Sequence, residues 1–144
     1  MLQQNKHTQI TKHQLAWILA DLLDEREISI LTRECGIRDA VAQIHSCSVS
    51  CLIENLAEAF FGQETAEQTV HEYLVQKAEQ AIRRVSYMTV KEIRTFLKNP
   101  TYLVEAGDFS KIVWALLIDS RQDVQQHGQK LLKEYKMKFQ YYLA

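Results

Sequence analysis

Three cysteines and a histidine lie close enough in the sequence to hold a metal ion. They are Cys35, His45, Cys47 and Cys51, and thiolate and imidazole groups are the ligands of tetrahedral zinc sites. Cys47 and Cys51 are one helical turn apart, so both thiols would share a helix face. Structural zinc cysteines, however, commonly occupy turns, whereas these residues lie in an apolar segment. We therefore favour buried thiols that pack as small apolar side chains, with a metal or redox site as an alternative.

Residues 29–46 contain a second pattern, which resembles a helix-turn-helix. Gly36 would form the turn, and Arg33, Arg38 and Gln43 are the side chains that could contact DNA. The second helix of this motif carries little positive charge, because Asp39 offsets Arg38, and a DNA-binding surface needs lysine or arginine near the phosphates. Nucleic-acid binding is therefore an alternative that the sequence does not favour.

The C-terminal residues carry more aromatic side chains than one buried helix face needs, and lysines lie between them. Such a mixture could stack single-stranded nucleic acid, but an excess of aromatic surface more often marks a contact with protein. We expect the partner to be another protein or a second copy of the chain, which would form a homodimer through the C-terminal helix. The predicted partner-binding residues are Trp17, Trp114, Tyr135, Phe139, Tyr141 and Tyr142.

Patterns typical of enzymes are missing from the sequence. It contains no glycine-rich phosphate loop, no G-x-S-x-G and no H-E-x-x-H. Glu54 and Glu58 are one helical turn apart, but a di-metal carboxylate site would also need Glu-x-x-His on two helices. We therefore expect a helical adaptor or regulatory protein that is not an enzyme and uses no cofactor.

The composition predicts an all-α fold. The chain of 144 residues has four glycines and one proline, which are too few for the many turns of an all-β protein. Its length fits one domain. No apolar run is long enough to span a membrane, and the polar N-terminus is unlike a secretory signal. An odd number of cysteines then fits free thiols in the reducing cytoplasm.

Several helix ends can be placed from the sequence. Capping boxes are expected at Thr11 with Gln14, at Thr65 with Gln68 and at Thr89 with Glu92, whereas residues 24–26 are expected to form a break or a solvated turn. The longest weakly charged stretch, residues 40–61, is predicted to be a central buried helix or two short helices. We therefore predict a single compact bundle of six to eight helices over residues 11–144, built around 40–61 and preceded by a flexible lead at 1–10.

The charges are sorted along the chain although the net charge is −1. Residues 52–76 contain five glutamates and no lysine or arginine, whereas residues 77–99 contain six basic residues and two acidic ones. We interpret these segments as neighbouring helices with complementary solvated faces, with a charged docking surface as the alternative. Gly128 lies inside the last helix, where glycine costs about 1 kcal/mol against alanine, so another backbone should pass close to it.

Overall fold

The computed structural model describes residues 10–37, 49–99 and 109–134. These residues form eight helices and no strand, which confirms the predicted all-α multi-helix bundle. Ile10, which the sequence placed in a flexible lead, is buried. The helices are α1 (Lys12–Leu22), α2 (Glu25–Glu34), α4 (Val49–Gly62), α5 (Glu64–Lys77), α6 (Glu79–Ser86), α7 (Val90–Leu97), α9 (Phe109–Leu117) and α10 (Gln122–Glu134).

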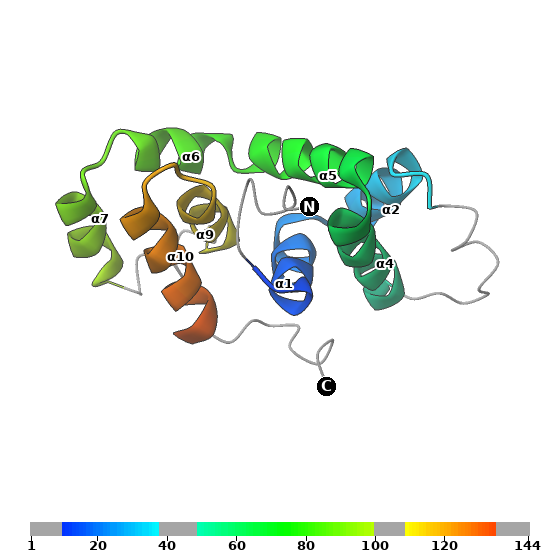
Figure 1. Ribbon diagram of the computed structural model, residues 1–144, viewed down its shortest axis with the longest axis horizontal. Helices are drawn as coiled ribbons and strands as arrows, with labels where there is room; N and C mark the ends of the chain where they lie inside the picture. Colours follow the sequence, from blue (N-terminus) through cyan, green and yellow to red (C-terminus); the bar gives the residue numbers. More distant parts are fainter. Residues whose placement is uncertain (1–9, 38–48, 100–108, 135–144) are drawn as a thin grey trace.

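The helices form two groups along the long axis of the molecule (Figure 1). Helix α4 packs on α1, α2 and α5 in one group, and α9 packs on α6 and α10 in the other. Contacts of α9 with α1 and α5 join the two groups. Helices α7 and α10 therefore lie at the end of the molecule that is far from α2 and α4 (Figure 1).

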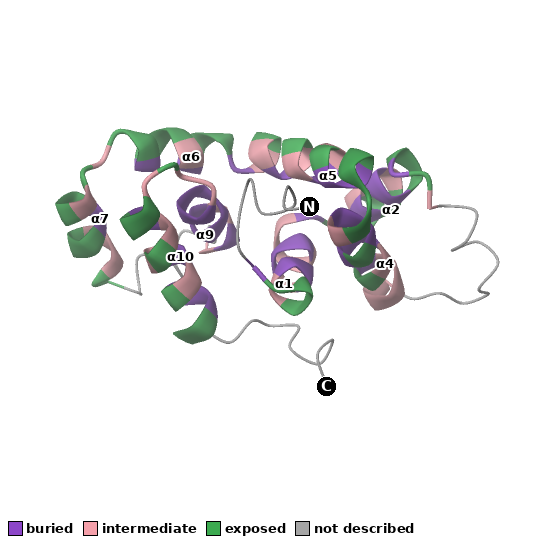
Figure 2. Ribbon diagram, viewed as in Figure 1, coloured by how far each residue is buried: buried purple, intermediate pink, exposed green. Residues whose placement is uncertain are grey.

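Helix α9 is the most completely buried element, as Figure 2 shows. Seven of its nine residues are buried, and its sequence FSKIVWALL has a single charged residue. Helix α4, the described part of the predicted central segment, buries residues on one side only, among them Ile53, Leu56 and Phe60. Residues 40–48 of that segment lie outside the described residues. The core is therefore shared between α4 and α9, because each of the two helix groups needs its own apolar centre.

Two of the three predicted capping boxes are confirmed. The Thr11 hydroxyl accepts a hydrogen bond from the Gln14 backbone N–H at 3.1 Å, and the Gln14 side-chain oxygen accepts one from the Thr11 backbone N–H at 3.0 Å. Thr89 and Glu92 make the same reciprocal pair at 3.1 and 2.7 Å. Each pair satisfies two backbone groups at a helix start, where no carbonyl of a preceding turn is available.

Two predicted helix starts are wrong. The break expected at 24–26 lies instead at Leu23 and Asp24, and α2 already begins at Glu25, where Asp24 and Glu27 form a further capping box at 2.8 and 3.0 Å. The predicted box at Thr65 is absent, because α5 already begins at Glu64 and Gln63 occupies the cap without a side-chain hydrogen bond. The helix that begins at Glu64 ends at Lys77, and Ala78 separates it from α6.

Gly128 lies where α10 crosses α9, as its position in the sequence predicts. A Cβ atom at Gly128 would be 3.1 Å from the Cβ of Leu116 and 3.1 Å from the Cγ of Leu117. Both leucines are fully buried. The absence of a side chain thus permits the close approach of α9 and α10, which form the most extensive helix pair of the structure.

Each of the two oppositely charged segments forms an ion pair with a helix that belongs to neither. Among the five glutamates of residues 52–76, only Glu58 forms an ion pair within the described residues, and its partner is Lys12 of α1. Lys77 pairs with Glu27 of α2 instead. Within the described residues no ion pair therefore joins the two segments, and the interpretation as complementary solvated faces stays a prediction. Five of the six basic residues of 77–99 lie in or directly after α6 and α7, at one end of the molecule (Figure 1).

Candidate protein-binding groove

The predicted partner-binding residues are only partly within the described structure. Trp114 is fully buried in α9 and packs against His71, with the ring centroids 5.7 Å apart. It has no exposed surface to offer a partner, because α9 forms the core of its helix group. Trp17 of α1 is half-buried. Tyr135, Phe139, Tyr141 and Tyr142 lie outside the described residues.

The two cysteines within the described residues, Cys35 and Cys51, are in different states. Burial, followed by the charge of Glu34, raises the pKa of the free Cys35 thiol to about 11, so the thiol is protonated at neutral pH. A metal ligand or nucleophile needs the thiolate. Cys51 is disulfide-bonded, which makes the prediction of free thiols wrong for this residue. His45 and Cys47 lie outside the described residues, and the described ones contain no group of three metal ligands.

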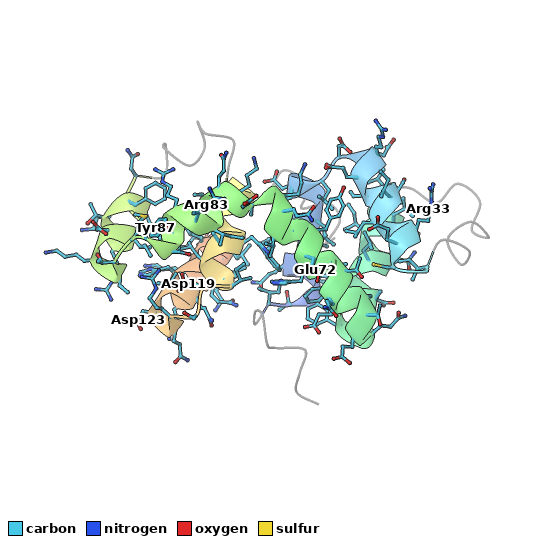
Figure 3. All side chains as sticks on the ribbon, turned by 90° about the horizontal axis from the view of Figure 1, so that it is seen from above. Arg33, Glu72, Arg83, Tyr87, Asp119 and Asp123 are labelled. Atoms are coloured by element: carbon cyan, nitrogen blue, oxygen red, sulfur yellow. The ribbon has the colours of Figure 1, made fainter. Side chains whose placement is uncertain are left out.

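The helix-turn-helix alternative is described only in its first half. Arg33 is exposed near the end of α2, at the opposite end of the molecule from Tyr87 (Figure 3). Gly36 has a φ of 77°, the left-handed conformation that ends α2 as predicted. Arg38 and Gln43, which would contact DNA, lie outside the described residues.

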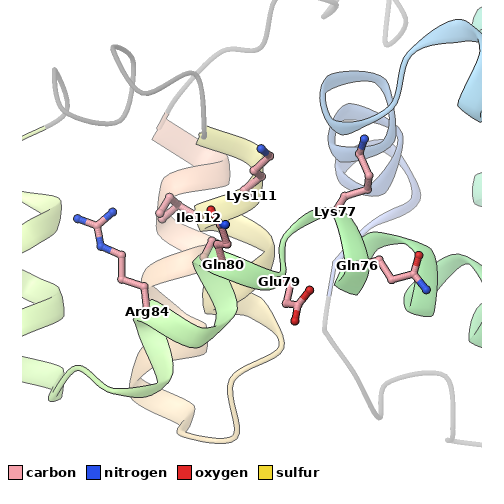
Figure 4. A pocket seen from close by; sticks show the side chains of 8 residues that line it. Gln76, Lys77, Glu79, Gln80, Arg84, Lys111 and Ile112 are labelled. Carbon is pink, nitrogen blue, oxygen red and sulfur yellow. The ribbon is translucent and has the colours of Figure 1, made fainter.

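A hollow between α5, α6 and α9 is lined mainly by polar side chains (Figure 4). It encloses about 500 Å³. Lys77 on its wall already pairs with Glu27, and Glu79 already pairs with Arg83. The hollow is therefore lined by charges of both signs, two of which already take part in ion pairs within the chain.

A groove between α7 and α10 combines apolar and positively charged side chains in a different way. It encloses about 370 Å³. Its apolar lining residues are the half-buried Leu97 of α7 and Leu131 of α10, which is only 5% exposed, and most of the remaining side chains are basic. We call it the α7–α10 groove. It is lined by Arg94, Leu97, Lys98, His127, Lys130, Leu131 and Glu134.

The positive charge of this groove is only partly neutralised. Lys130 is 3.9 Å from Glu134, but both side chains are well exposed, and such pairs contribute little. Arg94 and Lys98 have no acidic partner in the described part of the chain. Burial is the largest cause of the lowered pKa of His127, and the charges of Arg94 and Lys130 act on its imidazole in the same direction.

Arg121 holds the two walls of the α7–α10 groove in place. Its guanidinium donates hydrogen bonds to the backbone carbonyls of Val85 and Met88, at the turn between α6 and α7. Asp119 accepts from the Arg121 Nε and from a terminal nitrogen, both at 2.9 Å, and so orients the guanidinium. Arg121 directly precedes α10. The clamp therefore fixes the start of α7 against the start of α10.

Tyr87 is the one large apolar side chain that is strongly exposed among the described residues, at 82%. It occupies the turn between α6 and α7, next to the carbonyl of Met88 that Arg121 binds. Nearby, the guanidinium of Arg84 lies over the Phe96 ring, 4.8 Å from its centroid. An exposed aromatic side chain is a feature common at protein interfaces, although Tyr87 itself does not line the α7–α10 groove.

The sequence contains signs of this groove that our sequence analysis did not use. Arg94 and Lys98 are four residues apart and therefore share one face of α7, and His127 and Leu131 share one face of α10 in the same way. The excess of basic residues in 77–99 pointed to the same end of the chain. What the sequence could not show is that these two faces meet, because α7 and α10 are separated by the whole of α9.

The comparisons with known proteins complete this description. No helix among residues 10–37, 49–99 and 109–134 is long and apolar enough to cross a membrane. No protein-family model, curated protein or solved structure matches the chain.

Proposed function

We propose that this protein is a non-enzymatic adaptor or regulatory protein that acts by binding another protein through the α7–α10 groove. The observation that carries the proposal is the groove itself. It places the apolar Leu97 and Leu131 beside Arg94 and Lys98, which have no acidic partner among the described residues. A groove of this kind gains contacts and loses unbalanced charge when a protein segment fills it.

The experiment asks whether the full chain binds peptides through this groove, without assuming the peptide sequence. A random-peptide display library is selected on the wild-type protein, and the selected peptides are then measured by fluorescence anisotropy. The test variant is Arg94→Glu/Lys98→Glu, which reverses the charge of the groove wall. The matched control is Lys91→Glu/Lys133→Glu, which changes the net charge equally on exposed residues of α7 and α10 that do not line the groove.

The expected result is a set of peptides whose affinity falls at least tenfold in the groove variant and less than twofold in the control variant. Circular dichroism and thermal unfolding of each variant establish that both remain folded. Peptides that bind all three proteins equally would overturn the groove as the binding surface.

A homodimer through the C-terminal helix remains a separate prediction, because Tyr135 and Phe139 lie outside the described residues. Sedimentation equilibrium of the wild type and of Phe139→Asp tests it directly. Self-association that Phe139→Asp abolishes, and that charge reversal in the groove leaves intact, would place the partner surface in the tail. In that case the C-terminal tail, and not the α7–α10 groove, would be the surface for self-association.

A further inference from the structure

The occupant of the α7–α10 groove can be specified further from the arrangement of its charged and apolar side chains. We infer that the groove takes an acidic amphipathic helix of a partner protein, an inference that rests on the proposed function. The helix would lay an apolar stripe on Leu97 and Leu131 and direct carboxylates toward Arg94, Lys98 and Lys130.

The apolar surface sets the first requirement for the occupant. The half-buried Leu97 of α7 offers the larger apolar surface, and the buried Leu131 of α10 adds only its 5% exposed part beside it. Residues spaced by three and four along an amphipathic helix form a stripe that can cover such a surface. Among the described residues there is no strand whose edge could extend a partner strand, so recognition of an extended peptide by sheet addition is not available in this part of the chain.

The basic side chains set the second requirement. Arg94 and Lys98 are one helical turn apart on α7, and His127 and Lys130 are about one turn apart on α10. A helix lying between α7 and α10 would meet the charges of Arg94 and Lys98 on one flank and that of Lys130 on the other, because the lowered pKa of His127 leaves its imidazole uncharged at neutral pH. Glutamate or aspartate at a one-turn interval on the α7 flank matches the spacing of Arg94 and Lys98, and Arg94 can bind a carboxylate through two parallel hydrogen bonds.

The same side chains argue against a nucleic acid as the occupant. Phe, Tyr and Trp do not occur among the groove residues, and the imidazole of His127 is partly buried, so bases would find little ring surface to stack on. Glu134 also lines the groove, and a carboxylate there would repel a continuous phosphate backbone. An amphipathic helix can instead place its apolar side chains on the leucines and keep its carboxylates away from Glu134.

The test uses a designed peptide as the probe and the full chain as the receptor. The probe is an 18-residue fluorescein-labelled helix, an arbitrary length of about five turns, with leucines at i, i+3, i+4 and i+7 spacing and glutamates on both flanks. Two control peptides differ from it in one property each: lysine replaces every glutamate in one, and serine replaces every leucine in the other. Anisotropy titrations are done at low and at high salt, with single-stranded DNA as a competitor.

The expected result is saturable binding of the acidic peptide, with affinity at least tenfold lower for each control peptide and for Arg94→Glu/Lys98→Glu. Binding should weaken several-fold at high salt, because the charge pairs are at the surface. Amide NMR signals of Leu97, His127 and Leu131 should shift when the peptide is added, and this readout locates the site without any substitution.

Three outcomes would overturn the inference. The lysine peptide could bind as well as the acidic one, DNA could displace the peptide from the same signals, or the acidic peptide could fail to bind. If the unbiased selection still yields peptides that depend on the groove in any of these cases, the proposed function stands and only the acidic-helix inference is lost. If that selection also yields none, both are lost.

Discussion

Removing the guanidinium of Arg121 should cost far more stability than removing an exposed arginine of this protein. In Arg121→Ala the carbonyls of Val85 and Met88 lose a charged hydrogen-bond donor. The Asp119 side chain, which is 8% exposed, loses its cation. The clamp between the α6–α7 turn and the start of α10 is then gone.

The magnitude follows from the number of groups left without a partner. A hydrogen bond to a charged group contributes about 1.5–3 kcal/mol, and breaking a fully buried ion pair costs about 3–5 kcal/mol. The Arg121 side chain is 33% exposed, so water can reach part of the site and the cost must be reduced accordingly. We expect Arg121→Ala to lower the free energy of unfolding by about 2–3 kcal/mol. Arg121→Lys should lose about half as much, because a single ammonium group cannot reproduce the planar fork of donors.

The assay is urea unfolding followed by circular dichroism, with Arg83→Ala as the matched control. Arg83 also pairs with a carboxylate, Glu79, but the two side chains are 60% and 63% exposed. Its removal should cost less than about 0.5 kcal/mol. If Arg121→Ala is no more destabilising than Arg83→Ala, the reasoning about the clamp is refuted. The affinity of the α7–α10 groove for its peptide should also fall in Arg121→Ala, although Arg121 does not line the groove.

Four further predictions concern other parts of the structure. Gly128→Ala should destabilise the protein by about 1 kcal/mol in the urea unfolding assay, because crowding of the buried leucines of α9 outweighs the gain in helix propensity. Gly62→Ala, which has open space around its Cβ, should be close to neutral in the same assay. Arg121 lowers the pKa of Asp119 below its usual 3.8. The pair therefore stabilises the folded state above pH about 4, and this effect is lost as the pH falls through the folded-state pKa. The free energy of unfolding of Asp119→Asn, measured across pH 3–7, should lie below that of the wild type by an amount that shrinks at the acidic end. With a pKa of about 11, Cys35 should react with iodoacetamide at pH 8 roughly a hundredfold more slowly in the folded than in the unfolded protein, measured by mass spectrometry of its peptide. Glu67 is buried with one carboxylate oxygen that has no hydrogen-bond partner in the described structure, so Glu67→Leu should raise the free energy of unfolding by about 1 kcal/mol, and a clear loss of stability would show that the carboxylate has a structural role.

The local features of this chain could be predicted from its sequence because their causes are local. The capping boxes at Thr11 and Thr89 depend on side chains three residues apart, and the left-handed Gly36 ends a helix within one turn. The scarcity of glycine and proline and the helical spacing of apolar residues were enough to establish an all-α bundle. The error at Asp24 also has a local cause: the D-x-x-E spacing of a capping box was present in the sequence, but we interpreted residues 24–26 as a break or a solvated turn.

The site required the tertiary structure because its parts are distant in sequence. Trp114 could be placed on an apolar helix, but only the packing of α9 against α1, α5, α6 and α10 shows that no surface of it remains exposed. In the same way, Arg121 reaches carbonyls more than thirty residues earlier in the chain. A short polar motif is readable because hydrogen bonds within one turn do not depend on the rest of the fold. Which helix faces meet is decided by the burial of apolar surface over the whole molecule, and that burial brought α7 beside α10.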